Sequence, residues 1–129
     1  MANLIKSTVP NSGNDPEIAA LDAPYAVVPL SASGAISASQ GFCPITASGV
    51  AALTLAAPTA GLPSAGGNDG QVIRIFDTGG HAHTVTTPSN GINGNKHIIT
   101  FGGAVPNFIE LLAYNGVWYV LASSGVTLS

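Results

Sequence analysis

The sequence predicts an all-β fold, on three observations. Short apolar stretches recur through its 129 residues, separated by clusters of Gly, Pro and Asn that favour turns. Several of these stretches alternate between apolar and polar residues, as half-buried strands do. Two of them are joined by Asn115-Gly116, a dipeptide typical of a two-residue hairpin loop. Together these features indicate a single small β-barrel or β-sandwich domain.

The first 30 residues are predicted to form an extended arm that precedes the domain. Prolines interrupt any long regular element in this region, at Pro10, Pro16, Pro24 and Pro29. The helical signal in residues 14–21 covers about two turns at best, which is too short to be stable without a packing partner. We therefore expect the arm either to fray or to order on a partner. Its expected contact residues are Leu4, Ile5, Ile18, Leu21, Tyr25, Val27 and Val28.

Residues 31–129 are predicted to form the β domain, although the first candidate strand already begins at residue 26. Gly-rich clusters such as 66–70 mark the turns between strands. Asn115-Gly116 supplies the positive φ that a type I′ turn needs between the last two strands. The candidate strands are residues 26–31, 35–39, 51–56, 71–77, 83–87, 97–101, 108–114 and 117–121.

Two of these strands are apolar on both sides. In one of them Ile73 and Ile75 share a face, while Arg74 lies on the other face with apolar neighbours. In residues 108–114, Glu110 likewise has apolar neighbours on its own face. Because a small monomeric barrel has a wet outside, a second apolar face favours contacts between subunits. The residues expected in a trimer interface or in the core are Phe76, Tyr114, Trp118 and Tyr119.

The charge content is very low and unevenly distributed. Charged residues make up 7% of the chain, against about 25% in an average soluble domain, and the formal net charge is −3. With 3 basic residues the chain cannot neutralise a useful number of phosphates, so nucleic-acid binding is not expected. Residues 23–68 contain no charged side chain, so we expect the domain or a partner to cover much of this span.

No signal for export or membrane insertion is recognisable. The N-terminus lacks the apolar run of a signal peptide, and no stretch reaches the roughly 18 to 20 apolar residues of a spanning helix. Cys43 is the single cysteine, which fits a protein made in a reducing cytoplasm. We expect this cysteine to act as a small buried hydrophobic residue.

The sequence contains no recognisable catalytic or cofactor-binding motif, so we expect no enzymatic activity and no cofactor. Asp69, Asp77 and Glu110 could form paired carboxylates, but Asp residues near Gly are typically turn-formers. His81 and His83 would lie on one side of a strand, and three chains around a three-fold axis could then bind a metal ion. The simpler expectation for these two histidines is a polar, solvent-facing strand without a metal.

Five segments, taken in order, resemble a module found in virion proteins of tailed phages. They are LTLAAPTAG (53–61), DGQVIRI (69–75), AHTVT (82–86), TFGGA (100–104) and AYNGVWYV (113–120), and the resemblance covers roughly residues 50–121. The module occurs in capsid decoration and head-fibre proteins. The resemblance implies a small β-barrel of the β-tulip type that forms a homotrimer on the outer surface of a phage head, without enzymatic activity.

The interpretation that follows is a capsid decoration, or cement, protein whose arm binds neighbouring subunits of the major capsid protein. The chain would be made in the host cytoplasm and would then join the virion. The same module also occurs in tail fibres, so the alternative is a tail-fibre or head-fibre adhesin that contacts the host surface. Only residues 122–129 follow the matching region, too few for a receptor-binding domain, so we expect decoration rather than adhesion.

Overall fold

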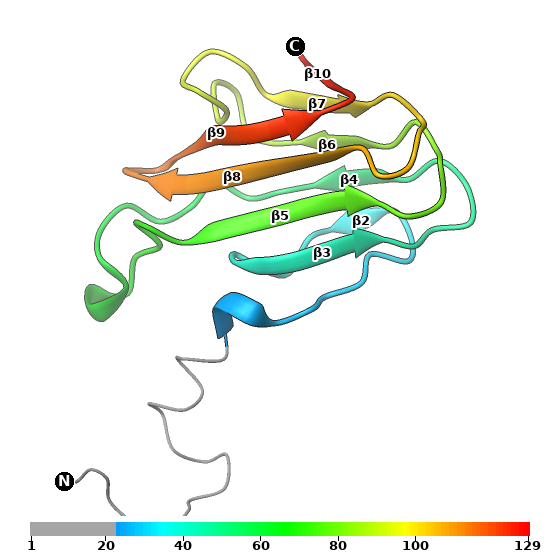
Figure 1. Ribbon diagram of the computed structural model, residues 1–129. Coiled ribbons are helices and arrows are strands. Elements are labelled where there is room, and N and C mark those ends of the chain that lie inside the picture. Colours follow the sequence, from blue (N-terminus) through cyan, green and yellow to red (C-terminus); the bar gives the residue numbers. More distant parts are fainter. Residues whose placement is uncertain (1–22) are drawn as a thin grey trace, which may run out of the picture.

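The computed structural model describes residues 23–129, which form two stacked mixed β-sheets (Figure 1). The first sheet has the order β3-β5-β8-β9, formed by Gly41–Ile45, Val72–Asp77, Phe108–Tyr114 and Val117–Ser124. The second has the order β10-β7-β6-β4-β2, formed by Val126–Leu128, Ile98–Phe101, Thr84–Thr86, Ala52–Thr54 and Gly34–Ala35. Two short 3-10 turns, η1 (Ala23–Tyr25) and η2 (Pro63–Ala65), complete the described part. It contains no helix of the length and apolarity needed to cross a membrane.

Parallel strand pairs arise because the chain passes back and forth between the two sheets. The strands β2, β4 and β6 lie in one sheet, and β3 and β5, which come between them in the sequence, lie in the other. Each strand therefore re-enters its own sheet in the same direction, which gives the parallel pairs β2–β4, β4–β6 and β3–β5. Parallel neighbours need a long crossover connection. In this protein a strand of the opposite sheet supplies that connection in place of a helix.

The two sheets confirm the all-β prediction, but they do not close into the barrel that the resemblance implies. A barrel needs main-chain pairing around its whole circumference. In the described residues the strand orders instead end at β3 and β9 in one sheet and at β2 and β10 in the other. The chain turns from β9 into β10 at Gly125, whose φ is 70°. The architecture is therefore two open sheets, the sandwich-like alternative.

Residues 26–30, which the sequence assigns both to the arm and to a strand, lie along the free edge of β3. The Val28 N–H donates to the Phe42 carbonyl at 2.8 Å, and the Leu30 N–H donates to the Pro44 carbonyl at 2.8 Å. Leu30 is buried, so the packed domain begins before residue 31. Val28 packs against the core, whereas Tyr25 and Val27 are exposed. The other expected arm residues, Leu4, Ile5, Ile18 and Leu21, lie outside the described residues.

The core lies between the inner faces of the two sheets. In β5 and β8 every second side chain is buried, which confirms that Ile73 and Ile75 share the inner face. Trp118 is 1% exposed, and its indole N–H donates to the Ala56 carbonyl at 3.0 Å. Burying each large aliphatic side chain contributes about 1.5–3 kcal/mol, so this layer is the main source of stability. Its fully buried aliphatic members include Ile45, Leu53, Ile73, Ile75, Val85, Ile92, Ile99, Ile109 and Leu111.

Local turn chemistry agrees with the sequence, while some strand limits differ. Asn115 has φ 49° and Gly116 has φ 83°, which confirms the hairpin between β8 and β9. The strand predicted at residues 35–39 is limited to β2, because the chain leaves the sheet after Ile36 bonds to the Thr54 carbonyl. Two strands, β3 and β10, have no counterpart among the predicted strands.

Candidate functional site

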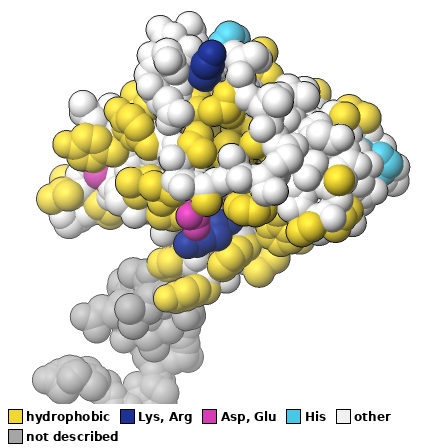
Figure 2. Space-filling view, turned by 45° about the horizontal axis from the view of Figure 1, so that its top comes forward, with side chains coloured by type: hydrophobic (Ala, Val, Ile, Leu, Met, Phe, Trp, Pro, Cys, Tyr) yellow, Lys and Arg dark blue, Asp and Glu magenta, His cyan; other side chains and the backbone are white. Residues whose placement is uncertain are grey.

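The surface that stands out is the outward side of the sheet β3-β5-β8-β9, which we call the outer face. Successive side chains on a strand point to opposite sides, so the residues between the buried ones point away from the core. Figure 2 shows hydrophobic side chains gathered on one side of the molecule around one basic and one acidic group. The outer face comprises Phe42, Val72, Arg74, Phe76, Phe108, Glu110, Leu112, Tyr114 and Tyr119.

Strand register pairs the outer-face residues of β5 and β8 directly across the sheet. Arg74 lies opposite Glu110, Phe76 opposite Phe108, and Val72 opposite Leu112. Such cross-strand pairs contribute roughly 0.2–1 kcal/mol each. The face is therefore built as three pairs in a row: an aromatic pair, an ion pair and an aliphatic pair.

The two charges of the outer face neutralise each other. The Arg74 Nε–H donates to Glu110 Oε2 at 2.6 Å, and the two side chains are 41% and 24% exposed. The guanidinium also lies over the Phe42 ring, 5.2 Å from its centroid. A partly exposed ion pair of this kind contributes about 0–1 kcal/mol to stability. Its main consequence is that an apolar surface is presented without a net charge.

A groove of about 510 Å³ runs across the centre of the outer face. Its lining combines aromatic and aliphatic side chains with the ion pair, and it lies within the size range of ligand-binding pockets. The residues that line it are Phe42, Arg74, Ile75, Phe76, Pro106, Phe108, Glu110 and Ala122. A second hollow of similar size adjoins it, because both share Arg74.

Three of the four residues expected in a trimer interface or in the core lie on the outer face. Phe76 lines the groove, while Tyr114 and Tyr119 are 57% and 39% exposed. Trp118 points the other way and belongs to the core, as alternation along β9 requires. Trp118 and Tyr119 thus lie on opposite faces of β9. Further along β9, Ala122 adds to this surface, since it pairs with Glu110 and lines the groove.

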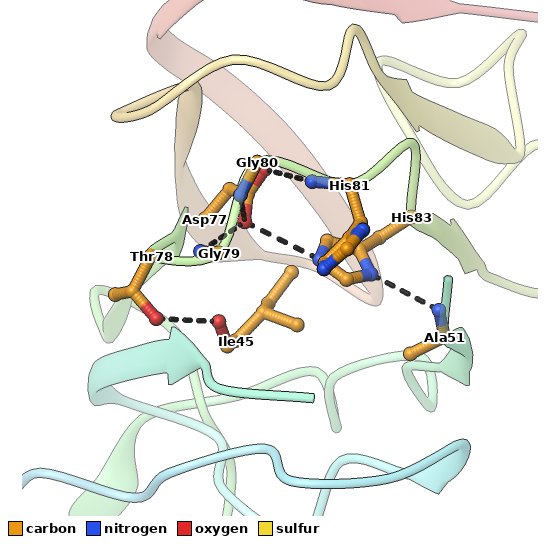
Figure 3. A network of polar contacts seen from close by, with 8 residues as sticks. All are labelled: Ile45, Ala51, Asp77, Thr78, Gly79, Gly80, His81 and His83. Atoms are coloured by element: carbon orange, nitrogen blue, oxygen red, sulfur yellow. Dashed lines mark hydrogen bonds and ion pairs between the residues drawn. The ribbon is translucent and has the colours of Figure 1, made fainter. Parts of the chain in front are cut away.

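Apart from the ion pair on the outer face, there is a cluster of polar groups buried between the sheets. It connects Asp77 with the turn that follows β5 (Figure 3). The Oδ1 atom of Asp77 accepts hydrogen bonds from the N–H groups of Gly79 and Gly80, at 2.9 and 3.0 Å. Its Oδ2 atom accepts the His81 N–H at 3.0 Å. Consecutive N–H groups that converge on one anion form a nest. The expectation that Asp77 forms a turn is therefore confirmed.

His83 completes this cluster, and both of its ring nitrogens are used. Nδ1 accepts the Ala51 N–H at 3.0 Å, so the proton lies on Nε2, which is 3.3 Å from Asp77 Oδ1. Both side chains are fully buried. Burial by itself raises the pKa of Asp77, but the three backbone N–H groups and His83 outweigh it, so the pKa of this carboxyl lies below its ordinary value. Through these contacts, Asp77 and His83 link the turn after β5 to Ala51, just before β4.

This geometry corrects the expectation for the two histidines. Residues 81–83 form a loop ahead of β6 and not a solvent-facing strand, and His83 is fully buried. Because both nitrogens of His83 bond within the chain, it cannot join His81 as a metal ligand in this arrangement. In residues 23–129 no group of three or more His, Cys, Asp or Glu side chains is placed to bind a metal ion.

The cysteine and the other candidate carboxylates have surroundings that explain them as structural residues. Cys43 is buried, and burial raises the pKa of its thiol to about 11, which keeps it protonated at neutral pH. Asp69 accepts the Asn115 N–H at 2.8 Å and so supports the hairpin, and Glu110 is paired with Arg74. The three carboxylates considered together in the sequence thus have separate partners. Sequence reasoning missed the groove, because it depends on the register between β5 and β8.

No protein-family model matches the chain, and no curated protein matches it either.

Proposed function

We propose that this chain is a structural virion protein, a capsid decoration protein that forms a homotrimer on the outer surface of a phage head. The observation that carries the proposal is the outer face, an apolar sheet surface whose two charges are paired with each other. Large exposed apolar patches of monomeric proteins typically mark interaction sites. The resemblance of residues 50–121 to a phage virion module names the class of assembly.

The outer face supplies contacts of the kind that an assembly uses. Aromatic residues such as Phe76, Tyr114 and Tyr119 are enriched at the centres of protein interfaces, and unpaired charges are depleted there. In a trimer, three copies of a weak contact act together, so binding to a shell gains from the effective concentration. Because the protein binds the assembled shell and not free subunits, it stabilises the shell by linkage.

Only part of the predicted arm is free to contact capsid subunits in this proposal. Residues 26–30 are already paired with β3 of the same chain, and Pro29 cannot donate a ladder hydrogen bond to a further strand. Contacts with neighbouring major-capsid subunits therefore fall to the residues before this segment, which include Leu4, Ile5, Ile18 and Leu21. Exposed Tyr25 and Val27 extend that surface at the edge of β3.

Binding to phage heads assembled without this protein is the direct test. We expect the full chain to sediment with these heads, and quantitative mass spectrometry of complete virions to give hundreds of copies per particle. A few copies per virion would refute decoration and would favour a tail component. Binding of the isolated protein to host cells or glycans, without binding to heads, would favour the adhesin alternative.

A further inference from the structure

The groove of the outer face lies next to the point where the described chain begins. Pro24 and Tyr25 of η1 line the second hollow, together with Gln71, Val72 and Arg74. Because Arg74 also lines the groove, the second hollow adjoins the groove on one side and η1 on the other. Residues 1–22, which we call the N-terminal segment, therefore join the domain directly beside the groove.

The length of the N-terminal segment allows it to reach every part of the outer face. Fully extended, 22 residues span about 70 Å, and Leu21 lies within about 7 Å of Ala23 along the chain. A segment tethered this closely has an effective concentration in the millimolar range. Even an intrinsic Kd of about 1 mM, or about −4.1 kcal/mol, would therefore keep the groove occupied for much of the time.

The composition of the N-terminal segment complements the groove. Its apolar residues Ile18 and Leu21 can pack on aromatic rings such as those of Phe42, Phe76 and Phe108. The segment has 1 Lys and carries its carboxylates at Asp15, Glu17 and Asp22, the last of them immediately before η1.

Arg74 offers donors for one of these carboxylates. Its Nε–H binds Glu110, but a guanidinium has five N–H donors and this side chain is 41% exposed. Bidentate pairing through the remaining donors is the usual mode of carboxylate recognition by Arg.

We propose that the N-terminal segment of the same chain docks into the outer-face groove of the free protein. Ile18 and Leu21 pack against the aromatic rings, and the Asp22 carboxylate binds Arg74. This inference concerns the free chain and does not depend on the proposed function. If the chain does join an assembly, the segment and the sister subunits compete for the same surface.

Paramagnetic relaxation in the full-length protein tests the docking directly. A spin label is attached to Ala20→Cys in ¹⁵N-labelled protein, and the buried thiol of Cys43, with its raised pKa, does not compete for the label. We expect at least a twofold loss of amide intensity at Phe76, Phe108 and Glu110. The amides of β4 and β6 lie in the opposite sheet, about 10 Å further from the label, and should lose less intensity. Unchanged or uniformly reduced intensities would overturn the proposal.

A mixed sample separates docking within one chain from exchange between chains. Spin-labelled ¹⁴N protein is combined with unlabelled ¹⁵N protein under conditions that allow subunits to exchange. We expect no loss of intensity at Phe76 and Phe108 in this mixture. A loss equal to that seen when one chain carries both the spin label and ¹⁵N would overturn docking within one chain.

Two substitutions add a matched comparison in the labelled protein. Phe76→Ser removes a ring from the groove and should restore the intensity at Phe108, whereas Tyr119→Ser changes the same face outside the groove lining and should not. Equal effects of the two variants would refute the assigned groove. All of these measurements use protein without phage heads, so they succeed or fail independently of the decoration proposal.

Discussion

Replacing Asp77 with Asn should strongly destabilise the domain, because no orientation of an amide satisfies the cluster around this residue. The carboxylate accepts hydrogen bonds at Oδ1 from Gly79, Gly80 and His83, and at Oδ2 from His81. An amide oxygen placed at Oδ1 keeps three of these bonds. The amide NH₂ then faces the His81 N–H, so two donors meet in a buried site.

The magnitude follows from these contacts. A buried donor left without an acceptor costs about 1–3 kcal/mol, and bonds to a charged acceptor are stronger than bonds to a neutral one. We therefore expect Asp77→Asn to lower the free energy of unfolding by about 3 kcal/mol. For a domain of this size that corresponds to a decrease in Tm of about 12 °C.

The pH dependence gives the sign of the electrostatic part. The pKa of Asp77 in the folded protein lies below its unfolded value of about 3.9, so the folded state binds fewer protons there. The stabilisation is complete above the unfolded pKa and is lost as the pH falls through the folded pKa. The difference in stability between wild type and Asp77→Asn should therefore be largest at neutral pH and should shrink below about pH 4.

Urea unfolding monitored by the fluorescence of Trp118, which is 1% exposed, measures both effects. Asp69→Asn is the matched control, since that carboxylate accepts one backbone hydrogen bond in an exposed position and should cost less than about 1 kcal/mol. The reasoning is refuted if Asp77→Asn is as stable as Asp69→Asn at neutral pH. A difference that stays constant down to pH 2 would refute the electrostatic part alone.

Three further predictions concern the turn between β9 and β10, the core and the outer face. Gly125→Ala should lower Tm far more than Gly94→Ala. Both glycines have positive φ, but an added Cβ would clash with the Asn107 side chain at Gly125 and would meet open space at Gly94. Trp118→Phe should cost about 1–3 kcal/mol in urea unfolding monitored by circular dichroism, because the Ala56 carbonyl loses its donor; an unchanged midpoint would contradict this. Phe76→Ser should weaken binding to phage heads at least tenfold in a sedimentation assay with little change in Tm, and wild-type binding would count against the proposed interface.

Local signals in the sequence identify the hairpin and the alternation of β5 and β8, but they cannot identify β3 or β10. Pro44 lies within β3, and proline argues against an interior strand because it lacks an N–H donor. β3 forms nonetheless, because it pairs with β5 on one side and with residues 26–30 on the other. β10 has three residues and is defined by its pairing with β7. Both strands thus depend on contacts between distant parts of the chain.

The buried Asp77–His83 cluster and the Arg74–Glu110 ion pair likewise depend on contacts between distant residues. The sequence indicates that Asp77 forms a turn, since its neighbours Gly79 and Gly80 allow a tight loop. It does not indicate that His83 closes this turn against Ala51, because that contact joins residues 32 positions apart in the sequence. Alternation along β8 places Glu110 on an apolar face, but only the register with β5 shows that Arg74 neutralises it.

Most of the few charged side chains in residues 23–129 are buried or paired. Asp77 is buried, and Arg74 and Glu110 bind each other, which leaves Asp69 and Lys96 as the separate charges of residues 23–129. Such a surface offers little repulsion between copies, and proteins with few surface charges tend to associate. The carboxylates that remain are concentrated in the N-terminal segment, at Asp15, Glu17 and Asp22. If that segment docks into the groove, it covers the apolar surface and adds negative charge there, so the free protein would resist association until a partner displaces the segment.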